Sequence, residues 1–492
     1  MKKYRYLLLI IPIIIFCVKN VVVDNDIWFL LNHGRYVYNN GIPFIEPFTL
    51  HEGFSFVMQQ WLSSLIFWVI NLNFGNIGLF LFVVLIGLII CIFYYKLCNR
   101  ISNNKYLSII VTILFSFVIR NYVVSRPQIF TYLLLISELY FLESYVKTNN
   151  KRYLYVLPFI SLLQINLHAS MWFMQFAFLI PFIINGVKFK NFKLSNYYLK
   201  PILIVSILMF LVGFINPYGI DAITYVFNSY GVNQINELIA EMKPISYVNS
   251  GLNLKILLCC IFVIIFCFNY FKERKIEVRH LCLLFGTLLL VFMNIKSLPY
   301  FFMIYFYAIS YFFKNTKTKE IIVLNKLNKN RFIKAFNFGL KTGCYFMLIV
   351  TLGYTFYYSI INLKYDNAFK QSADVILNDM KKEDIRLYVG YNNGGYMEYR
   401  GIKAYIDPRA EVFLKKNNKK EDIFNEYYEM DKKEDFDFTR FIDKYKFTHF
   451  LVYPDEKIEA YLINYDDKYK LLYEQYENED LIGRVYKTIM VE

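Results

Sequence analysis

The feature that most constrains the fold of this 492-residue chain is a series of apolar segments separated by loops of alternating charge. Apolar segments of roughly 20 residues are expected to cross a bilayer as helices, and shorter ones can do so with packed neighbours. They run over residues 6–23, 77–95, 107–124, 129–146, 154–168, 171–187, 201–215, 254–270, 281–295, 299–313 and 342–363. The sequence therefore predicts a polytopic α-helical membrane protein with about 11 transmembrane helices.

Every second loop between these segments is rich in Lys and Arg. The cations of these loops are Lys96, Arg100 and Lys105; Lys147, Lys151 and Arg152; Lys188, Lys190, Lys193 and Lys200; Lys272, Arg274, Lys275 and Arg279; and those of the run 314–341. By the positive-inside rule these loops are cytoplasmic, together with the amino-terminal Lys2, Lys3 and Arg5. An odd number of helices then places the carboxy-terminal segment outside the plasma membrane.

Charge and composition divide the chain into two predicted domains. Residues 1–365 carry 33 Lys and Arg against 12 Asp and Glu, a net +21, whereas 366–492 carry 21 against 27, a net −6. The first is predicted to be a transmembrane domain with a large first outer loop, 24–76, and the second an extracytoplasmic α/β domain. The basicity belongs to the membrane domain, so the bilayer is the expected partner and nucleic acid is not.

The eight cysteines offer no framework for disulfides or metal. All of them (residues 17, 91, 98, 259, 260, 267, 282 and 344) lie in or beside apolar segments, and none follows residue 344. No CxxC pair occurs. A disulfide scaffold and a zinc site of the Cys-pair type are therefore not expected.

Residues 60–74 are apolar but are predicted to lie on the outer leaflet as an interfacial helix. The segment is short, carries two Trp and ends in a polar turn. Tryptophan is enriched where a membrane meets water. Counting this segment as a span would also reverse the side of every later loop.

Patterning after residue 366 predicts a small α/β domain. Helices are expected over 368–380 and 435–445, and strands over 386–389, 403–406, 448–453, 470–474 and 483–488. The strand over 448–453 is predicted to be buried because its apolar run is nearly continuous.

The predicted outer loops contain most of the unusual polar side chains. These are Asp24, Asp26, His33, Arg126, His168, Glu241 and Lys296. Asp24 and Asp26 follow the first apolar segment directly and share one side of an extended segment. A carboxylate at a membrane surface can act as a general base toward a hydroxyl acceptor, although a charge pair at a helix exit can also be a topological stop.

The cations and histidines among these residues have two interpretations each. Arg126 and Lys296, at the outer mouths of helices, suit a donor phosphate, but they could equally snorkel to lipid headgroups. His33 and His168 are candidate substrate contacts or packed histidines. Glu241 is a candidate substrate contact or a solvated loop charge. Glu138, in the middle of a span, must face the bundle interior and is expected to make a structural hydrogen bond.

The order of short motifs resembles that of the GT-C superfamily of membrane glycosyltransferases, and within it bacterial members similar to the protein mannosyltransferase and aminoarabinose transferase types. The motifs that carry the resemblance are Asp24-x-Asp26-x-Trp28-x-x-Leu31 with Gly34; Gly41-x-Pro43 with Pro47-Phe48; Arg126-Pro127-Gln128; Asn166-x-His168; Asn216-Pro217-Tyr218-Gly219; Gly394-Gly395-Tyr396; and Asp407-Pro408-Arg409. An acidic pair after the first helix and a W-L-x-x-L surface helix before the second span also fit. The resemblance covers nearly the whole chain.

The resemblance implies transfer of a sugar from a polyprenyl-phosphate donor to a cell-surface glycan, lipid or protein at the outer face, with inversion. Asp24 or Asp26 would be the base, and either could help to hold Mg²⁺ or Mn²⁺ if a metal is used. Arg126 and Lys296 would bind the donor phosphate, and His33, His168 and Glu241 would contact substrate. The Gly394 and Asp407 motifs are expected either to form turns or to present a docking surface for the acceptor.

Two other functions are compatible with the same features. A transporter or flippase for lipid-linked precursors would also need many helices and outer cations, but it is expected to place polar groups at the bilayer midplane. A non-catalytic cell-envelope assembly protein could share the fold without the activity.

Overall fold

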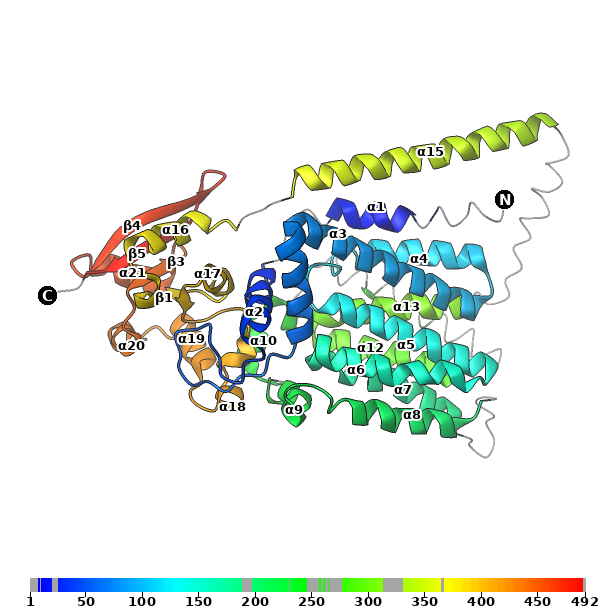
Figure 1. Ribbon diagram of the computed structural model, residues 1–492, viewed down its shortest axis with the longest axis horizontal. Coiled ribbons are helices and arrows are strands. Elements are labelled where there is room, and N and C mark those ends of the chain that lie inside the picture. The colour runs from blue at the N-terminus through cyan, green and yellow to red at the C-terminus, as the bar shows by residue number, and fades with distance from the viewer. Residues whose placement is uncertain are drawn as a thin grey trace.

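The computed structural model describes residues 8, 10–19, 25–187, 197–229, 231–245, 277–312, 331–363, 367–489 and five positions between 256 and 264. Asp24 and most of the predicted span 254–270 lie outside the described residues. A helical bundle occupies one half of the molecule and an α/β part the other (Figure 1). The bundle helices end at Ile361, and the sheet with the helices around it follows from Lys370 onward.

The bundle helices run side by side along that axis (Figure 1). Their bounds are α1 Ile10–Lys19, α3 Trp61–Ser102, α4 Lys105–Ile119, α5 Gln128–Thr148, α6 Leu157–Leu167, α7 Phe173–Gly186, α8 Leu199–Val212, α12 Val278–Met293, α13 Leu298–Phe312 and α15 Arg331–Ile361. Each predicted span apart from 254–270 falls on helical structure.

By length and composition, the described residues contain four helical segments able to cross a membrane: Trp61–Ser102, Gln128–Thr148, Ala169–Gly186 and Thr342–Ile361. Three more apolar helices are shorter, namely Lys105–Ile119, Leu199–Val212 and Val278–Met293. These helices are those of a membrane protein, but the count of 11 is not confirmed. Short helices cross a bilayer only where neighbours or local thinning compensate for their length.

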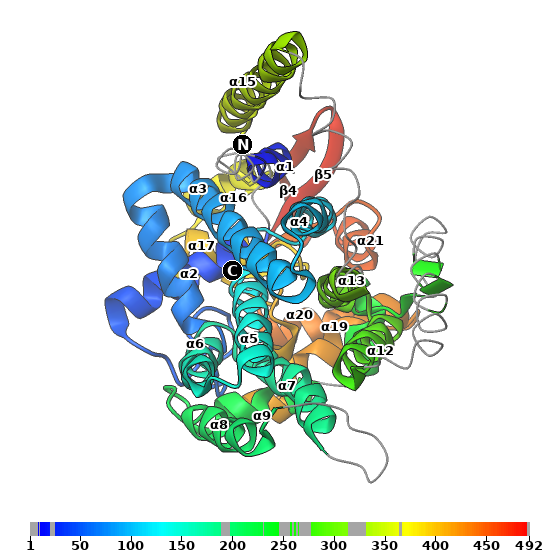
Figure 2. The same ribbon diagram turned by 90° about the vertical axis from the view of Figure 1, so that its right-hand side faces the viewer.

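The helices differ in how much of their apolar surface is covered. In the most apolar 18 residues of each helix, the buried share is 78% for α5 but only 11% for α15. Figure 2 shows α15 apart from the other helices and beside α1. Ser359 Oγ donates to the carbonyl of Cys17, at 2.5 Å, where the two meet.

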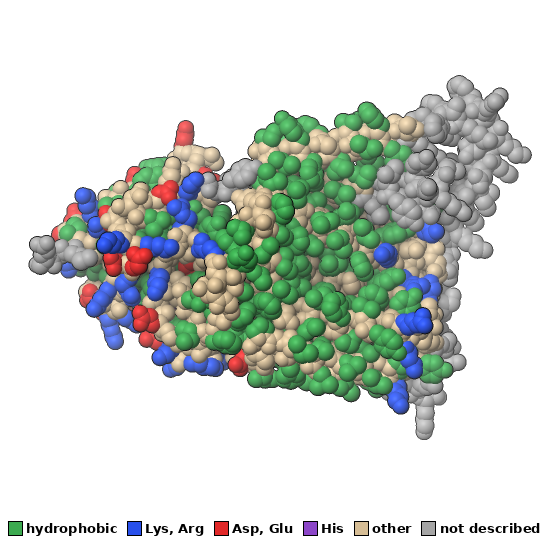
Figure 3. Space-filling view, viewed as in Figure 1, with side chains coloured by type: hydrophobic (Ala, Val, Ile, Leu, Met, Phe, Trp, Pro, Cys, Tyr) green, Lys and Arg blue, Asp and Glu red, His purple; other side chains and the backbone are tan. Residues whose placement is uncertain are grey.

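The two ends of the bundle have different chemistry. At the end remote from the α/β part, Arg100 Nε donates to Ser144 Oγ (2.9 Å) and Lys147 Nζ to Asn103 Oδ1 (2.6 Å), so two predicted cytoplasmic loops meet there. Figure 3 shows Lys and Arg gathered at this end and hydrophobic side chains along the sides of the bundle. The loops with the candidate site residues are at the opposite end.

Helix α3 is two helices joined at a sharp bend. Gly75 has φ +60° and ψ −159°, so helical geometry is interrupted there. Residues 61–74 lie across the end of the bundle and 76–102 run along it (Figure 1). The first part exposes Val69, Leu72 and Phe74. The segment is therefore separate from the second span, as predicted, and presents apolar side chains outward.

The α/β part is built on a five-stranded sheet with the order β2-β1-β3-β5-β4. Strands β1 Arg386–Val389, β2 Lys403–Ala404 and β3 His449–Val452 are parallel, and β4 Tyr469–Glu477 pairs antiparallel with β5 Asp480–Thr488, which borders β3. All four residues of β3 are buried, which confirms the predicted buried strand.

Short helices surround this sheet. They are α16 Lys370–Asp379, α17 Gly394–Arg400, α18 Lys415–Asn418, α19 Ile423–Lys432, α20 Phe438–Tyr445 and α21 Lys457–Asn464. The strands predicted over 386–389, 470–474 and 483–488 and the helix over 368–380 are confirmed with small shifts. The Gly394 motif begins helix α17 and is not the predicted turn. Its first glycine is required because a Cβ there would lie 1.9 Å from the carbonyl oxygen of Ile406.

The first loop joins the two halves through helix α2 (Ile27–Asn40). On one side α2 approaches α3 so closely that a Cβ on Gly34 would lie 2.1 Å from the carbonyl oxygen of Ser64. On the other side Trp28 packs edge-on against Tyr396 of α17, with ring centroids 5.0 Å apart. Further along the loop, Thr49 forms a parallel bridge with Ala404, so the loop extends the edge of the sheet.

We predict that Gly75→Ala lowers the melting temperature of the purified protein in detergent. The backbone at Gly75 occupies a region that is nearly restricted to glycine, and a side chain there costs roughly 1–3 kcal/mol. Gly286→Ala is the control because Gly286 lies within α12 and an added Cβ meets nothing within 4 Å. Equal melting temperatures for the two variants would show that the bend does not need a glycine.

Candidate functional site

Three predicted site residues converge at the end of the bundle that faces the α/β part. Arg126 Nε lies 3.1 Å from Asp26 Oδ2, and its Nη1 lies 3.2 Å from Glu241 Oε1. Asp26 is the N-cap of α2, Arg126 precedes α5, and Glu241 lies in the 3₁₀ turn η4 (Ala240–Met242). One guanidinium therefore joins three segments that are far apart in the sequence.

The three side chains are all accessible to solvent. Their exposed fractions are 21% for Arg126, 28% for Asp26 and 52% for Glu241. Ion pairs this exposed contribute little to stability, on the order of 0–1 kcal/mol. Such an arrangement costs little to open, so Arg126 is in a position to exchange a carboxylate for another anion.

Lys296 lies beside this group, in the 3₁₀ turn Ile295–Ser297. The turn is held to the Glu241 segment because the backbone N–H of Ile295 donates to the carbonyl of Lys243 at 3.2 Å. The charge of Lys296 acts on His168 and on Glu411, which follows the Asp407 motif. Two cations and three acids thus gather at one end of the bundle.

Glu411 is a site residue that the sequence analysis did not single out. Its Oε1 accepts a hydrogen bond of 2.6 Å from Gln59, the residue two before the surface helix of α3. Burial raises the pKa of Glu411, while the Gln59 hydrogen bond and the charges of Lys296 and Arg409 oppose the rise. Its position two residues after Arg409 was the only signal available in the sequence.

His168 is buried and hydrogen-bonded within the bundle. Its Nδ1 lies 2.8 Å from Thr131 Oγ1, and Gln164 Nε2 donates to the same hydroxyl at 3.0 Å. The adjacent Ala169 N–H donates to the carbonyl of Gln59 at 2.8 Å. His168 itself is therefore bonded inside the bundle, while the residue after it is tied to Gln59, the partner of Glu411.

His33 is separated from the Arg126 group and belongs to a second, buried cluster. At its centre Arg409 is 2% exposed and donates to His33 Nε2 (3.0 Å), to Glu46 Oε1 (3.0 Å) and to Glu398 Oε2 (3.4 Å). Its Nε also donates to Asp407 Oδ1 at 2.9 Å. The Asp407 motif therefore forms an internal ion cluster and presents no docking surface.

The guanidinium of Arg409 is also enclosed by aromatic rings. Its central carbon is 5.4 Å from the ring centroids of both Phe48 and Phe56. His33 stacks on Phe48 at 4.9 Å. Cation–π contacts are strongest where water is excluded, so the rings and the carboxylates act together on one charge.

The charges of this cluster fix its protonation. Burial, with the negative charges of Asp407 and Glu46, raises the pKa of Glu398 well above its usual range. Burial and the charge of Arg409 lower the pKa of His33 well below its usual value, so the imidazole is neutral. Arginine has no acceptor, so Nε2 of His33 must accept and its proton is on Nδ1.

The structure also bears on Glu138 and on the possible metal ligands. Glu138 is fully buried, yet neither of its carboxyl oxygens has a hydrogen-bond partner in the described part of the chain, so the expected hydrogen bond is not found. Within the described ranges, no group of three His, Cys, Asp or Glu side chains is arranged to hold a metal ion. The other suggested ligand, Asp24, lies outside those ranges.

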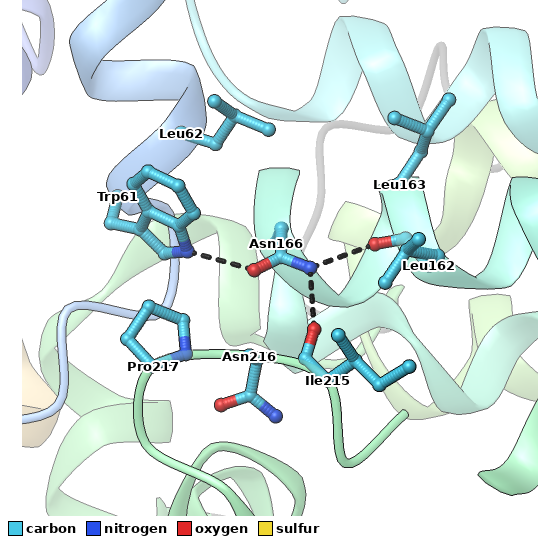
Figure 4. A pocket seen from close by; sticks show the side chains of 8 residues that line it. All are labelled: Trp61, Leu62, Leu162, Leu163, Asn166, Ile215, Asn216 and Pro217. Carbon is cyan, nitrogen blue, oxygen red and sulfur yellow. Dashed lines mark hydrogen bonds between the residues drawn. The ribbon is translucent and has the colours of Figure 1, made fainter. Parts of the chain in front are cut away.

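A groove of about 520 Å³ opens on the outside of the bundle between the surface helix, α6 and the loop after α8. It is lined by Trp61, Leu62, Leu162, Leu163, Asn166, Ile215, Asn216 and Pro217 (Figure 4). Both ends of the Asn166 amide are satisfied, by Trp61 and by the carbonyls of Leu162 and Ile215. The predicted motif residues Asn166 and Asn216 therefore shape the groove, and its remaining lining is apolar.

No protein-family model matches the chain, and no curated protein matches it. Among solved structures, the chain is similar to the apo form of the Archaeoglobus fulgidus oligosaccharyltransferase, with a TM-score of 0.63 and 11% sequence identity. The match covers 94% of this chain and 71% of that one.

This likeness concerns the fold, and it agrees with the GT-C-like fold expected from the ordered motifs. At 11% identity it supports the arrangement of helices and the α/β part alone. The bacterial type, the donor and the acceptor stay predictions.

We predict that Glu398→Gln removes part of the pH dependence of stability. Since the pKa of Glu398 is raised on folding, its proton stabilises the folded state below the unfolded pKa, about 4.3, and this stability is lost as the pH rises through the folded pKa. Glutamine imitates the protonated acid at every pH. The melting temperature of the variant relative to wild type should therefore increase with pH.

Asp407→Asn is the comparison. Asp407 accepts from Arg409 through its side chain and from the Arg409 backbone N–H at 2.7 Å, so the amide should lower the melting temperature at every pH tested. A pH slope unchanged by Glu398→Gln would mean that Glu398 is ionised in the folded protein.

Proposed function

We propose that this protein is a membrane glycosyltransferase that moves a sugar from a polyprenyl-phosphate donor to an acceptor at the cell surface. The observation that carries the proposal is the meeting of Asp26, Arg126 and Glu241, with Lys296 beside them, at the end of a GT-C-like bundle. Carboxylates for the acceptor hydroxyl and cations for the donor phosphate are both needed for this reaction, and both are present at one place.

The proposed step is a single displacement at the anomeric carbon. A carboxylate, Asp26 or Asp24, takes the proton of the acceptor hydroxyl as its oxygen bonds to the anomeric carbon. The bond from that carbon to the phosphate oxygen breaks, and its electron pair leaves with the phosphate. Attack opposite the leaving group inverts the anomeric configuration.

The cations act on the leaving group. Arg126 is suited to bidentate contact with a phosphate and Lys296 to contact as a point charge. Donor binding would exchange the exposed Glu241 carboxylate on Arg126 for phosphate oxygens. Glu241 and His168 would then border the sugar. The similar archaeal structure is that of an oligosaccharyltransferase, which supports transfer of a glycosyl group as the class of reaction.

The sidedness of the reaction is part of the proposal. The loops rich in Lys and Arg gather at one end of the bundle and the candidate site lies at the other. With the basic end in the cytoplasm, the site and the α/β part face outward from the plasma membrane. The acceptor would then be a cell-surface glycan, lipid or protein.

We predict that Asp26→Asn or Asp24→Asn lowers kcat by about 100-fold or more, since loss of a general base costs roughly 10²–10⁴-fold. For Asp26→Asn the donor KM should not rise, because a negative charge is removed from beside the phosphate site. Asp221→Asn, on an exposed acid of α9 (Ile220–Ser229), is the control. Purified variants are assayed with lipid-linked sugar, and surface glycans of complemented deletion strains are compared by mass spectrometry.

The results for these variants distinguish a glycosyltransferase from a flippase and from an assembly protein. Full transfer by both Asp variants would remove the catalytic assignment. Lipid translocation in vesicles without glycosidic transfer would indicate a flippase, and complementation by the double variant would indicate an assembly protein.

We predict that Arg126→Gln and Lys296→Gln each raise the donor KM by about tenfold or more, because a charge-assisted hydrogen bond contributes roughly 1.5–3 kcal/mol. Arg120→Gln is the control. Arg120 is the C-cap residue of α4, and its guanidinium lies 4.2 Å from the centroid of the Phe117 ring. Initial rates over a range of donor concentrations measure KM. Equal donor KM values for the wild type and both variants would contradict a phosphate-binding role.

A further inference from the structure

The buried Arg409 cluster reaches the candidate site through a single helix. His33 is the member of the cluster that belongs to α2, and Asp26 is the N-cap of the same helix. They are seven positions apart, which is nearly two turns, so both lie on one face of α2 at a spacing of ~10 Å along its axis. Because α2 is a rigid helix, a shift in the position of His33 also shifts Asp26.

The other contacts of α2 hold it to the same partner. Arg35 Nη2 donates to the carbonyl of Tyr399 at 2.8 Å, and Trp28 packs on Tyr396. At the end of α2 that carries Asp26, Asn25 Nδ2 donates to the carbonyl of Asn392 at 2.5 Å. These contacts extend from Asn25 to Arg35, so the α/β part, together with the bundle, fixes the position of Asp26.

The hydrogen bonds and ion pairs of the Arg409 cluster are directional, whereas apolar packing is not. Arg409 engages Asp407 within its own segment, Glu398 on α17, Glu46 in the first loop and His33 on α2. A guanidinium presents its donors in a fixed planar fork, so the positions of these four partners are set relative to one another. Apolar side chains in the same space would allow sliding.

We infer that His33 and Arg409 are positioning residues, which hold α2 against the α/β part so that Asp26 is directed at Arg126. This inference rests on the proposed function for its effect on rate, but the positioning itself is a property of the fold. His33 acts through α2 and does not contact the substrate. Its 1% exposure agrees with that role.

The test uses His33→Phe and His33→Gln in the full-length protein. Phenylalanine keeps the ring stack on Phe48 but cannot accept from Arg409, whereas the amide oxygen of glutamine can. His51→Phe is the matched control, because His51 is a buried histidine that joins the first loop to the α/β part through the carbonyl of Tyr405 (2.7 Å) and is not on α2.

A misplacement of about 1 Å at a reacting group can cost 10²-fold in rate. We expect His33→Phe to lower kcat by at least about tenfold without raising the KM for donor or acceptor, and His33→Gln to restore most of the rate. His51→Phe should keep kcat within about twofold of wild type even if it lowers the melting temperature equally.

A readout without activity separates this inference from the proposed function. Cysteines placed at Asn25 and Asn392 are joined with a short bismaleimide, and the cross-linked peptide is measured by mass spectrometry. Cross-linking should be reduced by His33→Phe and unchanged by His51→Phe and His33→Gln. If Asp24→Asn and Asp26→Asn both keep full transfer while this pattern holds, the proposed base fails and the positioning stands.

Two results would overturn the inference. Unchanged cross-linking in His33→Phe would show that the histidine does not hold α2. A rise in substrate KM with unchanged cross-linking would show that His33 contacts the substrate instead.

Discussion

The buried guanidinium of Arg409 is the interaction on which the arrangement of this protein depends. A charge with 2% exposure is stable only when hydrogen-bonded carboxylates surround it. Its partners come from α2 and the first loop, which precede it by 376 and 363 residues, and from α17, which precedes it by 11. The loop and the α/β part can therefore form their contact in one register only, and the candidate site lies along that contact.

The membrane imposes the second constraint. Apolar helices leave only their ends for polar chemistry, since an unpaired charge in hydrocarbon is costly. Basic side chains occupy one end of the bundle, and Asp26, Arg126, Glu241 and Lys296 are collected at the other. The exposed Arg126 pairs and the buried Arg409 cluster use the same kinds of residue for opposite purposes. The side chains of the first group are exposed to solvent, and those of the second are buried.

Sequence patterns predicted the elements better than their contacts. The strand Arg386–Val389 and the buried strand at 449–452 were predicted from period and apolarity, because a strand in a sheet core needs those side chains wherever it is. The Gly394 motif was predicted as a turn, yet its glycine serves the close approach of α17 to the backbone of Ile406. Because the need for glycine at this position comes from another segment of the chain, the residues next to it do not reveal it.

The candidate site shows the same division. The chain's charge pattern alone predicted that Asp26, Arg126 and Glu241 would share one face, because the number of spans between them decides the side. Only the tertiary structure decided that Arg126 pairs with both acids, that Glu411 lies within the electrostatic influence of Lys296 and that His33 bonds to Arg409. Membrane topology follows from the order of apolar and basic segments along the sequence, whereas hydrogen-bond partners depend on packing in three dimensions.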